Sequence, residues 1–253
     1  MNNLKHIKFQ DESKDIKPRV TNYWTNRADS FFVQRQHELD SPKAHKWLGE
    51  IKRKIGAKKP LKILDVGCGA GYFIVLLGLE GHDVTGIDLT GAMIERARKL
   101  IEMNEPYDCD LQAVVMDAEN LDFCDESFDV IITRNLTWTL PHPIKAYSEW
   151  HRVLKKGGML LNFDAEYAKG AYNLKNQENL AHKCISDEMK EECNKIYHML
   201  TISTLDRPQW DVNILYQIGF ESVDADCEFA DRMFDVKDEF YIPDRMFMIS
   251  AKK

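Results

Sequence analysis

Three glycines alternate along one short segment of the chain, LDVGCGAGYF at residues 64–73. Asp65 precedes Gly67, Gly69 and Gly71, and a short hydrophobic run leads into the segment. Glycines at a turn between a strand and a helix let the backbone approach a ligand closely, and they aim its N–H groups at an anionic or polar group. The spacing therefore predicts a turn that binds a cofactor, and the alternative is a tight turn without a ligand.

A second acidic residue follows the next hydrophobic run. Asp88 comes about 20 positions after Gly67, the separation at which a carboxylate accepts hydrogen bonds from a ribose. The dinucleotide fingerprint G-x-G-x-x-G needs a third glycine where this chain has Tyr72. The pattern predicts a nucleoside ligand, and it counts against a nicotinamide-dependent oxidoreductase, which stays as an alternative.

Short strands alternate with helices around these two motifs. Such alternation indicates parallel strands with helices on both faces, a doubly wound, mostly parallel α/β sheet of seven strands. Two late apolar runs, at 223–229 and 247–249, are expected to pair antiparallel at its edge. The expected central strands are 62–66, 83–87, 112–116, 130–133 and 159–163, and the expected helices are 72–79, 92–104 and 144–154, the last ended by Gly157 and Gly158.

The flanking segments differ from this core. Residues 1–19 are polar and predict a loosely docked start, whereas Ser41 and Pro42 begin a helix that Gly56 ends. A helical insert is expected at about 168–206, and a helix at 208–218 closed by Gly219. The acidic segment 231–239 is expected as a solvent-exposed connection, with a flap over the substrate as the alternative. We therefore divide the chain into an N-terminal helical cap, 1–58, and a cofactor-binding domain, 59–253.

From about Leu61 to Asp164 the sequence resembles the class I S-adenosylmethionine-dependent methyltransferases. The glycine segment matches the first motif of this family, Gly86-x-Asp88-x-Thr90 the second, and Asp117 the third. The resemblance implies a Rossmann-like fold and S-adenosylmethionine as cofactor, with Asp117 and Ala118 holding the adenine. Further cofactor contacts are implied for Cys68, Leu89, Met93, Glu119, Arg134 and Asn135.

A shorter match, Tyr23, Trp24, Arg27 and Ala28, resembles small-molecule methyltransferases related to quinone biosynthesis, in which these residues close over the methionine end. Packing is the alternative role for both aromatic residues. The implied reaction is displacement at the methyl carbon by a small-molecule acceptor, which needs positioning more than a protein nucleophile. A non-catalytic nucleoside-binding protein is the competing hypothesis. His142 is the candidate base, and Trp138, Asp164 and Tyr167 are candidate substrate contacts. A structural role is the favoured alternative for His142, Asp164 and Tyr167, and core packing is the alternative for Trp138.

The amino-acid composition and net charge of the chain limit which classes of function it can have. The chain has 253 residues, 44% hydrophobic and 30% charged, with a net charge of −7, which suits one globular domain with an appendage and argues against nucleic-acid binding. No early apolar segment or long apolar run indicates a leader or a membrane span, so a cytoplasmic protein is expected. His182, Cys184, Cys193 and His198 do not have the spacing of a metal site, and no metal is expected. The oligomeric state is left open.

Overall fold

A seven-stranded sheet forms the centre of the molecule in the computed structural model, which describes residues 13–56, 60–104, 109–167, 179–182 and 185–253. The strand order is β3-β2-β1-β4-β5-β7-β6. β1 to β5 are parallel, and β7 runs antiparallel between β5 and β6. The strands are β1 (Lys62–Val66), β2 (Asp83–Asp88), β3 (Leu111–Val115), β4 (Phe128–Arg134), β5 (Leu154–Ala165), β6 (Ser222–Asp226) and β7 (Met246–Lys252).

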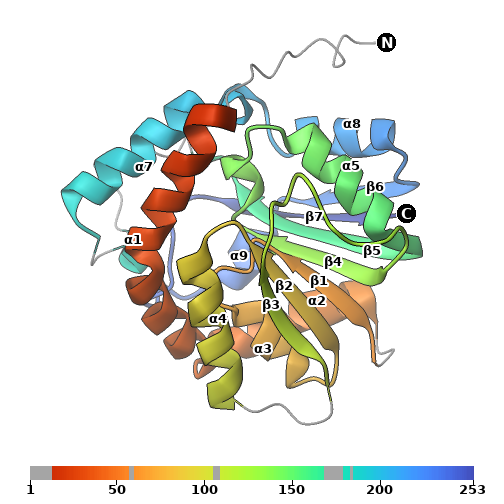
Figure 1. Cartoon of the computed structure of the whole chain (residues 1–253), viewed down its shortest axis with the longest axis horizontal. Coiled ribbons are helices and arrows are strands. Elements are labelled where there is room, and N and C mark those ends of the chain that lie inside the picture. The colour runs from red at the N-terminus through yellow and green to blue at the C-terminus, as the bar shows by residue number, and fades with distance from the viewer. Residues whose placement is uncertain (1–12, 57–59, 105–108, 168–178, 183–184) are drawn as a thin grey trace.

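Helices cover both faces of this sheet. Figure 1 shows α5 and α8 on one side and α2, α3 and α4 on the other, while α1 and α7 lie next to each other at the end of the molecule. The expected doubly wound α/β fold is confirmed. The helices are α1 (Ser13–Leu39), α2 (Pro42–Ile55), α3 (Tyr72–Gly78), α4 (Gly91–Asn104), α5 (Pro143–Val153), α7 (Asp187–Met199), α8 (Gln209–Ile218) and α9 (Phe229–Met233), with short 3-10 turns at Thr137–Thr139, Leu180–His182 and Thr201–Thr204.

Helix α2 begins and ends where its capping residues stand. The side chain of Ser41 accepts a hydrogen bond from the backbone of Lys43, Pro42 occupies the first turn, and Gly56 closes the helix with a φ of 74°. The ring of Trp47 is fully buried and lies 5.3 Å from that of Phe73, centre to centre. Because Trp47 packs in the core of the sheet, α2 is one of the helices that cover it.

Two expectations about the elements are wrong. Gly157 and Gly158 do not end a helix: α5 stops at Val153 and β5 begins at once at Leu154, with both glycines inside the strand. Gly157 has a φ of 74°, and a Cβ on Gly158 would lie 2.9 Å from the carbonyl oxygen of Asp129, so an irregular strand needs them. The start is not loosely docked from residue 13 onward, because α1 begins there and Ile16 is buried.

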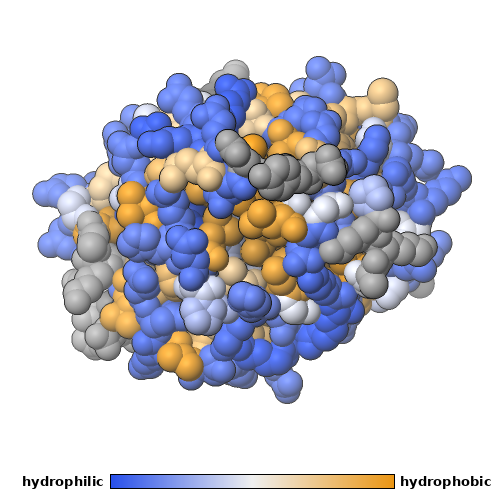
Figure 2. Space-filling model, turned by 90° about the horizontal axis from the view of Figure 1, so that it is seen from below, coloured by the Kyte–Doolittle hydropathy of each residue, from blue (hydrophilic) through white to orange (hydrophobic). Residues whose placement is uncertain are grey.

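The surface is mostly hydrophilic. Figure 2 shows this for the underside of the molecule, where a smaller hydrophobic area lies near the centre. Of the described helices, none is long and apolar enough to cross a membrane. Among the same residues, no three His, Cys, Asp or Glu side chains lie together as metal ligands; Cys184, from the set considered above, lies outside the described ranges.

Candidate active site

The glycine turn sits between β1 and α3 and forms the floor of a pocket. Gly67, Gly69 and Gly71 have φ angles of 70°, 52° and 87°, a backbone region that other residues rarely adopt. A Cβ on Gly67 would lie 2.8 Å from the side chain of Leu136, and one on Gly69 would lie 3.0 Å from the ring of Phe31. The turn therefore needs glycine both for its conformation and for the close approach of its neighbours.

A hydrogen bond joins the second sequence motif to this turn. Asp88, at the end of β2, accepts the Gly69 N–H through Oδ2 at 3.1 Å and the Thr90 N–H through Oδ1 at 2.8 Å. Each carboxylate oxygen has two lone pairs, so both oxygens keep capacity for a ribose hydroxyl. Burial raises the pKa of Asp88, and the two backbone hydrogen bonds oppose that shift. The two motifs thus form one cradle.

The expected adenine end of the cradle is closed by α1. Lys17 Nζ lies 2.6 Å from Asp117 Oδ2 and 2.6 Å from Glu119 Oε2. The other oxygen of Asp117 accepts the Glu119 N–H at 3.0 Å. Glu119 lies behind the pocket wall, whereas Asp117 forms part of it. The remaining predicted cofactor residues on this part of the wall are Leu89, Met93 and Ala118.

Asp65 is a buried carboxyl group on the pocket wall. Burial, together with the nearby charge of Asp88, raises the pKa of Asp65 to about 8, and Arg134 partly opposes the shift. Arg134 itself is held elsewhere: its guanidinium donates twice to Glu38, at 3.1 and 3.0 Å, and stacks 4.3 Å from the ring centre of Trp47. At neutral pH Asp65 is therefore mostly uncharged and is placed to ionise when a cation binds beside it.

A second arginine lies beside the glycine turn. The guanidinium carbon of Arg35 is 4.6 Å from the ring centre of Phe31 and 5.9 Å from that of Tyr72. Arg35 forms an ion pair with Glu38, and burial lowers the pKa of Arg35 to about 10. Within the described chain, Arg35 Nε and the Tyr72 hydroxyl are buried without a hydrogen-bond partner. These free polar groups suit the charged amino-acid end of a cofactor.

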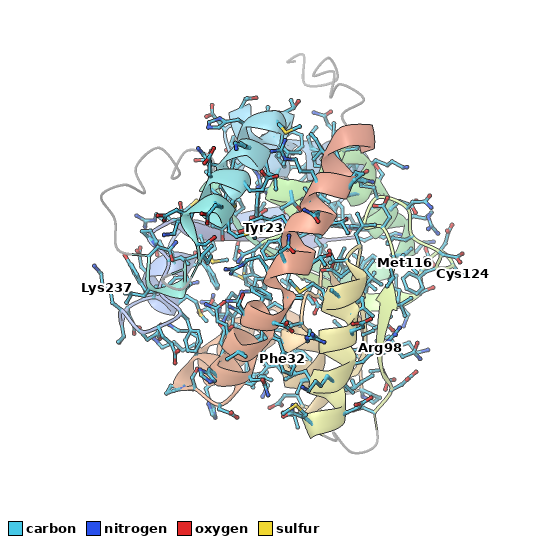
Figure 3. The ribbon with its side chains drawn as sticks, turned by 60° about the vertical axis from the view of Figure 1, so that its left-hand side comes forward. Tyr23, Phe32, Arg98, Met116, Cys124 and Lys237 are labelled. Atoms are coloured by element: carbon cyan, nitrogen blue, oxygen red, sulfur yellow. The ribbon has the colours of Figure 1, made fainter. Side chains whose placement is uncertain are left out.

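The short motif in α1 also faces the pocket. Tyr23 and Trp24 pack edge to face with ring centres 5.1 Å apart, and Trp24 packs similarly on Phe31 at 5.6 Å. Arg27, one turn after Tyr23, lies on the same wall and is 6% exposed. In Figure 3, Tyr23 lies on the side of α1 toward α7. That these residues touch the methionine end stays a prediction.

Aromatic side chains form a further part of the pocket lining. The ring centre of Trp138 lies 4.6 Å from that of Tyr197 and 5.6 Å from that of Tyr167. The Tyr167 hydroxyl donates to Asn135 Oδ1 at 2.6 Å. We use the name aromatic wall for Tyr23, Trp138, Tyr167, Tyr197, Phe234 and Phe240.

The side chains of His142 and Asp164, both predicted to be in the site, do not line the pocket. The backbone N–H of His142 donates to Glu119 at 2.8 Å, and His142 does not line the pocket. Asp164 is fully buried and accepts hydrogen bonds from the Trp138 N–H and from Arg207, both at 3.0 Å. This placement gives no support to a base role for His142 or to a substrate contact for Asp164, and both assignments stay predictions. Gly71 is likewise outside the pocket lining.

Sequence patterns missed several residues that line the pocket. Cys193 and Tyr197 come from α7, whose polar sequence showed no motif, and Phe240 follows an acidic segment expected to be an exposed connection. Phe240 is only 4% exposed. The helical spacing of Tyr23, Arg27 and Phe31 was the available signal for a pocket-facing side of α1.

Comparison with known proteins agrees with this geometry. Residues 64–162 match the methyltransferase domain family. Demethylmenaquinone methyltransferase of Staphylococcus aureus is 31% identical over 155 residues, which cover 59% of this chain and 61% of that protein. Phosphatidylethanolamine N-methyltransferase of Cereibacter sphaeroides is 40% identical over 101 residues, covering 38% and 47%. The chain therefore spans about three fifths or less of the length of these two relatives.

Solved structures share the fold at lower identity. A putative S-adenosylmethionine-dependent methyltransferase of Methanococcus maripaludis is 19% identical with a TM-score of 0.58, over 100% of this chain and 96% of that one. A phosphoethanolamine N-methyltransferase of Haemonchus contortus, with S-adenosylhomocysteine bound, is 20% identical with a TM-score of 0.57, over 81% and 52%.

The mostly parallel sheet and the cradle at the carboxyl ends of β1 and β2 define a Rossmann-like domain. Within it, residues 64–162 are similar to the methyltransferase domain family. A second phosphoethanolamine N-methyltransferase structure of Haemonchus contortus, 19% identical with a TM-score of 0.57, is in complex with S-adenosyl-L-methionine.

Proposed function

We propose that this protein transfers the methyl group of S-adenosylmethionine to a nucleophilic atom of a small-molecule acceptor. The observation that supports this most directly is the 3.1 Å hydrogen bond between Asp88 and Gly69, which joins two motifs into one cradle. The same pocket continues to the aromatic wall. A cofactor in the cradle therefore has space beside it for an acceptor.

The chemistry needs little from protein side chains. A lone pair of the acceptor forms a bond to the methyl carbon while the bond from carbon to sulfur breaks, and the electron pair stays on sulfur as a neutral thioether. An acceptor that carries a proton then loses it. Holding two reactants in an attack geometry supplies about 7 to 11 kcal/mol of the barrier. Aromatic side chains that exclude water and fix the orientation of the reactants therefore make the main contribution of this pocket to catalysis.

The likeness to named relatives supports a small acceptor. One relative is named for demethylmenaquinone and another for phosphatidylethanolamine. The enclosed wall formed by Trp138, Tyr167 and Tyr197 suits a compact molecule with an apolar body. A quinone-biosynthesis-like acceptor is part of this proposal, and a macromolecular acceptor is not.

Calorimetry with S-adenosylmethionine and S-adenosylhomocysteine tests the proposal. Both are expected to bind, and Asp88→Ala is expected to weaken both by at least about tenfold, because it removes charge-assisted hydrogen bonds. The matched control is Asp110→Ala, an exposed aspartate just before β3 whose carboxylate accepts from Gln112 at 3.0 Å. Absence of binding by folded wild-type protein would contradict the proposal.

Two alternatives predict different results. A non-catalytic nucleoside-binding protein would bind the cofactor yet transfer no methyl group to any acceptor in a broad panel. A nicotinamide-dependent enzyme would bind NAD in preference to S-adenosylmethionine. The buried ring of Tyr72 at the place of the third glycine counts against the latter.

A further inference from the structure

Among the described residues, no carboxylate forms an ion pair with the buried guanidinium of Arg27. The residue is 6% exposed and lines the pocket, and its Nε atom has no hydrogen-bond partner within the described chain. Tyr23 and Cys193 oppose the effect of burial on the pKa of Arg27, and Arg27 in turn lowers the pKa of Arg35. Burial lowers the pKa of Arg27, which reflects the cost of leaving this charge unpaired. A buried cation that faces a cavity is a binding site for an anion.

A second unsatisfied donor lies on the same wall. The indole N–H of Trp138 is buried and unpaired within the described residues. The two groups are linked through α7, because Cys193 hydrogen-bonds Tyr197 and the Tyr197 ring packs 4.6 Å from that of Trp138. Both free groups donate and neither accepts. A ligand that binds at this wall should therefore present a hydrogen-bond acceptor that carries negative charge.

The charges around the pocket point the same way. Arg35 and Arg134 share one carboxylate, Glu38, and Arg27 has none among the described ion pairs. S-adenosylmethionine brings a further net positive charge, because its sulfonium and ammonium groups outnumber its carboxylate. Ionised Asp65 can offset this charge, which leaves the unpaired guanidinium of Arg27 for an anionic group of the acceptor.

Arg35 is the arginine that we assign to the carboxylate of the cofactor. Arg35 lies against Phe31 and Tyr72, and both aromatic residues lie beside the glycine turn. Among the described residues, its Nε atom and the Tyr72 hydroxyl have no hydrogen-bond partner. Arg27 acts electrostatically on Arg35 but also lies beside Cys193 of α7. We therefore assign Arg27 to a second anionic group.

We infer that the acceptor is an organic anion with a flat apolar body, whose carboxylate or phosphate group pairs with Arg27 while the body packs on the aromatic wall. This inference rests on the proposed function. It replaces the expectation that Arg27 contacts the methionine end, and it assigns Arg27 to acceptor binding.

The test uses full-length protein saturated with S-adenosylhomocysteine and two anionic probes, benzoate and phenyl phosphate. Benzamide and benzyl alcohol are the neutral probes of similar shape. Thermal shift and calorimetry are expected to show binding of at least one anion and at least about tenfold weaker binding of both neutral probes. A preference for one anion tells a carboxylate site from a phosphate site.

Three variants assign the effect to Arg27. Arg27→Gln is expected to abolish the preference for the anion, and Arg27→Lys to restore part of it. Arg96→Gln is the matched control, because Arg96 is a surface residue of α4 paired with Asp29. In Arg27→Gln, the affinity for S-adenosylhomocysteine is expected to stay within about threefold of wild type, since that ligand keeps the methionine carboxylate.

Two results would overturn the inference. One is a loss of at least about tenfold in S-adenosylhomocysteine affinity in Arg27→Gln, which would assign the arginine to the cofactor. The other is equal binding of anionic and neutral probes, or no binding of either anion, by wild-type protein. Failure of the wild-type protein to bind S-adenosylhomocysteine would instead contradict the proposed function.

Discussion

The side chain of Asp164 fixes the backbone of Trp138, because Oδ2 of Asp164 accepts the Trp138 N–H at 3.0 Å. The same oxygen accepts a hydrogen bond from Arg207 at 3.0 Å, and Arg207 also donates to Asp211 at 2.9 and 3.0 Å. All three charged side chains are buried. The aromatic wall therefore rests on a buried ionic cluster that does not itself reach the pocket.

Removing the guanidinium of Arg207 from this cluster is expected to lower the free energy of unfolding. Arg207→Met leaves Asp164 and Asp211 buried without a counter-ion, a change that costs about 3 to 5 kcal/mol of unfolding free energy. Arg245→Met, which breaks an exposed pair with Asp231, is expected to cost less than about 1 kcal/mol. Urea denaturation of both variants measures the difference, and equal midpoints would contradict it.

A substitution at Gly71 separates backbone strain from steric conflict. Gly71 and Gly81 have similar φ angles of 87° and 81°, but a Cβ on Gly71 would lie 2.9 Å from Cα of Ala97, whereas a Cβ on Gly81 would meet nothing within 4 Å. Gly81→Ala is therefore expected to cost about 1 to 2 kcal/mol from conformation alone. Gly71→Ala is expected to cost more, and to weaken cofactor binding as the turn shifts. Thermal melts together with calorimetry decide this, and similar losses in both variants would refute the steric argument.

The raised pKa of Asp65 predicts opposite effects of pH on stability and on binding. With a folded-state pKa of about 8 against an ordinary 3.8, folded protein keeps the proton that unfolded chains release between these values. The contribution of Asp65 to stability is therefore greatest below pH 4 and is lost as pH rises to about 8. Asp65→Asn is expected to gain stability relative to wild type across this range.

Cofactor affinity is expected to rise with pH in the wild-type protein, because ionised Asp65 attracts the positively charged cofactor. Asp65→Asn has no carboxylate to ionise, so its weaker affinity is expected to lack that rise. Melting curves of the cofactor-free proteins and calorimetry with S-adenosylmethionine from pH 6 to about 8.5 test both trends. The assignment to Asp65 is wrong if wild type and variant respond to pH alike.

The fold and the cradle could be predicted from the sequence, because patterns within short segments specify them. Glycines with positive φ, a strand that ends in Asp88, and the alternation of strands with helices are properties of short segments. The antiparallel pairing of β6 with β7 also follows from their alternating and apolar residues. An ambiguous local pattern led to a wrong prediction at Gly157 and Gly158. They lie inside β5, although helices commonly end at a glycine.

The aromatic wall could not be predicted from the sequence, because its residues come from segments that lie far apart in the chain. Tyr23 and Cys193 are brought together only by the packing of α1 on α7. The acidic segment 231–239 favoured an exposed connection, with a flap over the substrate as the alternative. Its first residues belong to α9, and Phe240, which follows it, is buried and lines the pocket, which agrees better with the alternative. His142 seemed placed for catalysis by its loop, yet its backbone is held by Glu119 behind the wall. Tertiary packing, and not residue type, decides each of these positions.

The origin of α7 between β5 and β6 has a consequence for specificity. The donor cradle belongs to the first four strands, whereas Cys193 and Tyr197 belong to this later helix. One part of the proposed acceptor surface is thus encoded apart from the donor cradle, whereas Tyr23, Arg27 and Trp138 come from α1 and from the segment after β4. Exchanging α7 for that of a related methyltransferase should therefore change this part of the acceptor surface and leave the donor cradle intact.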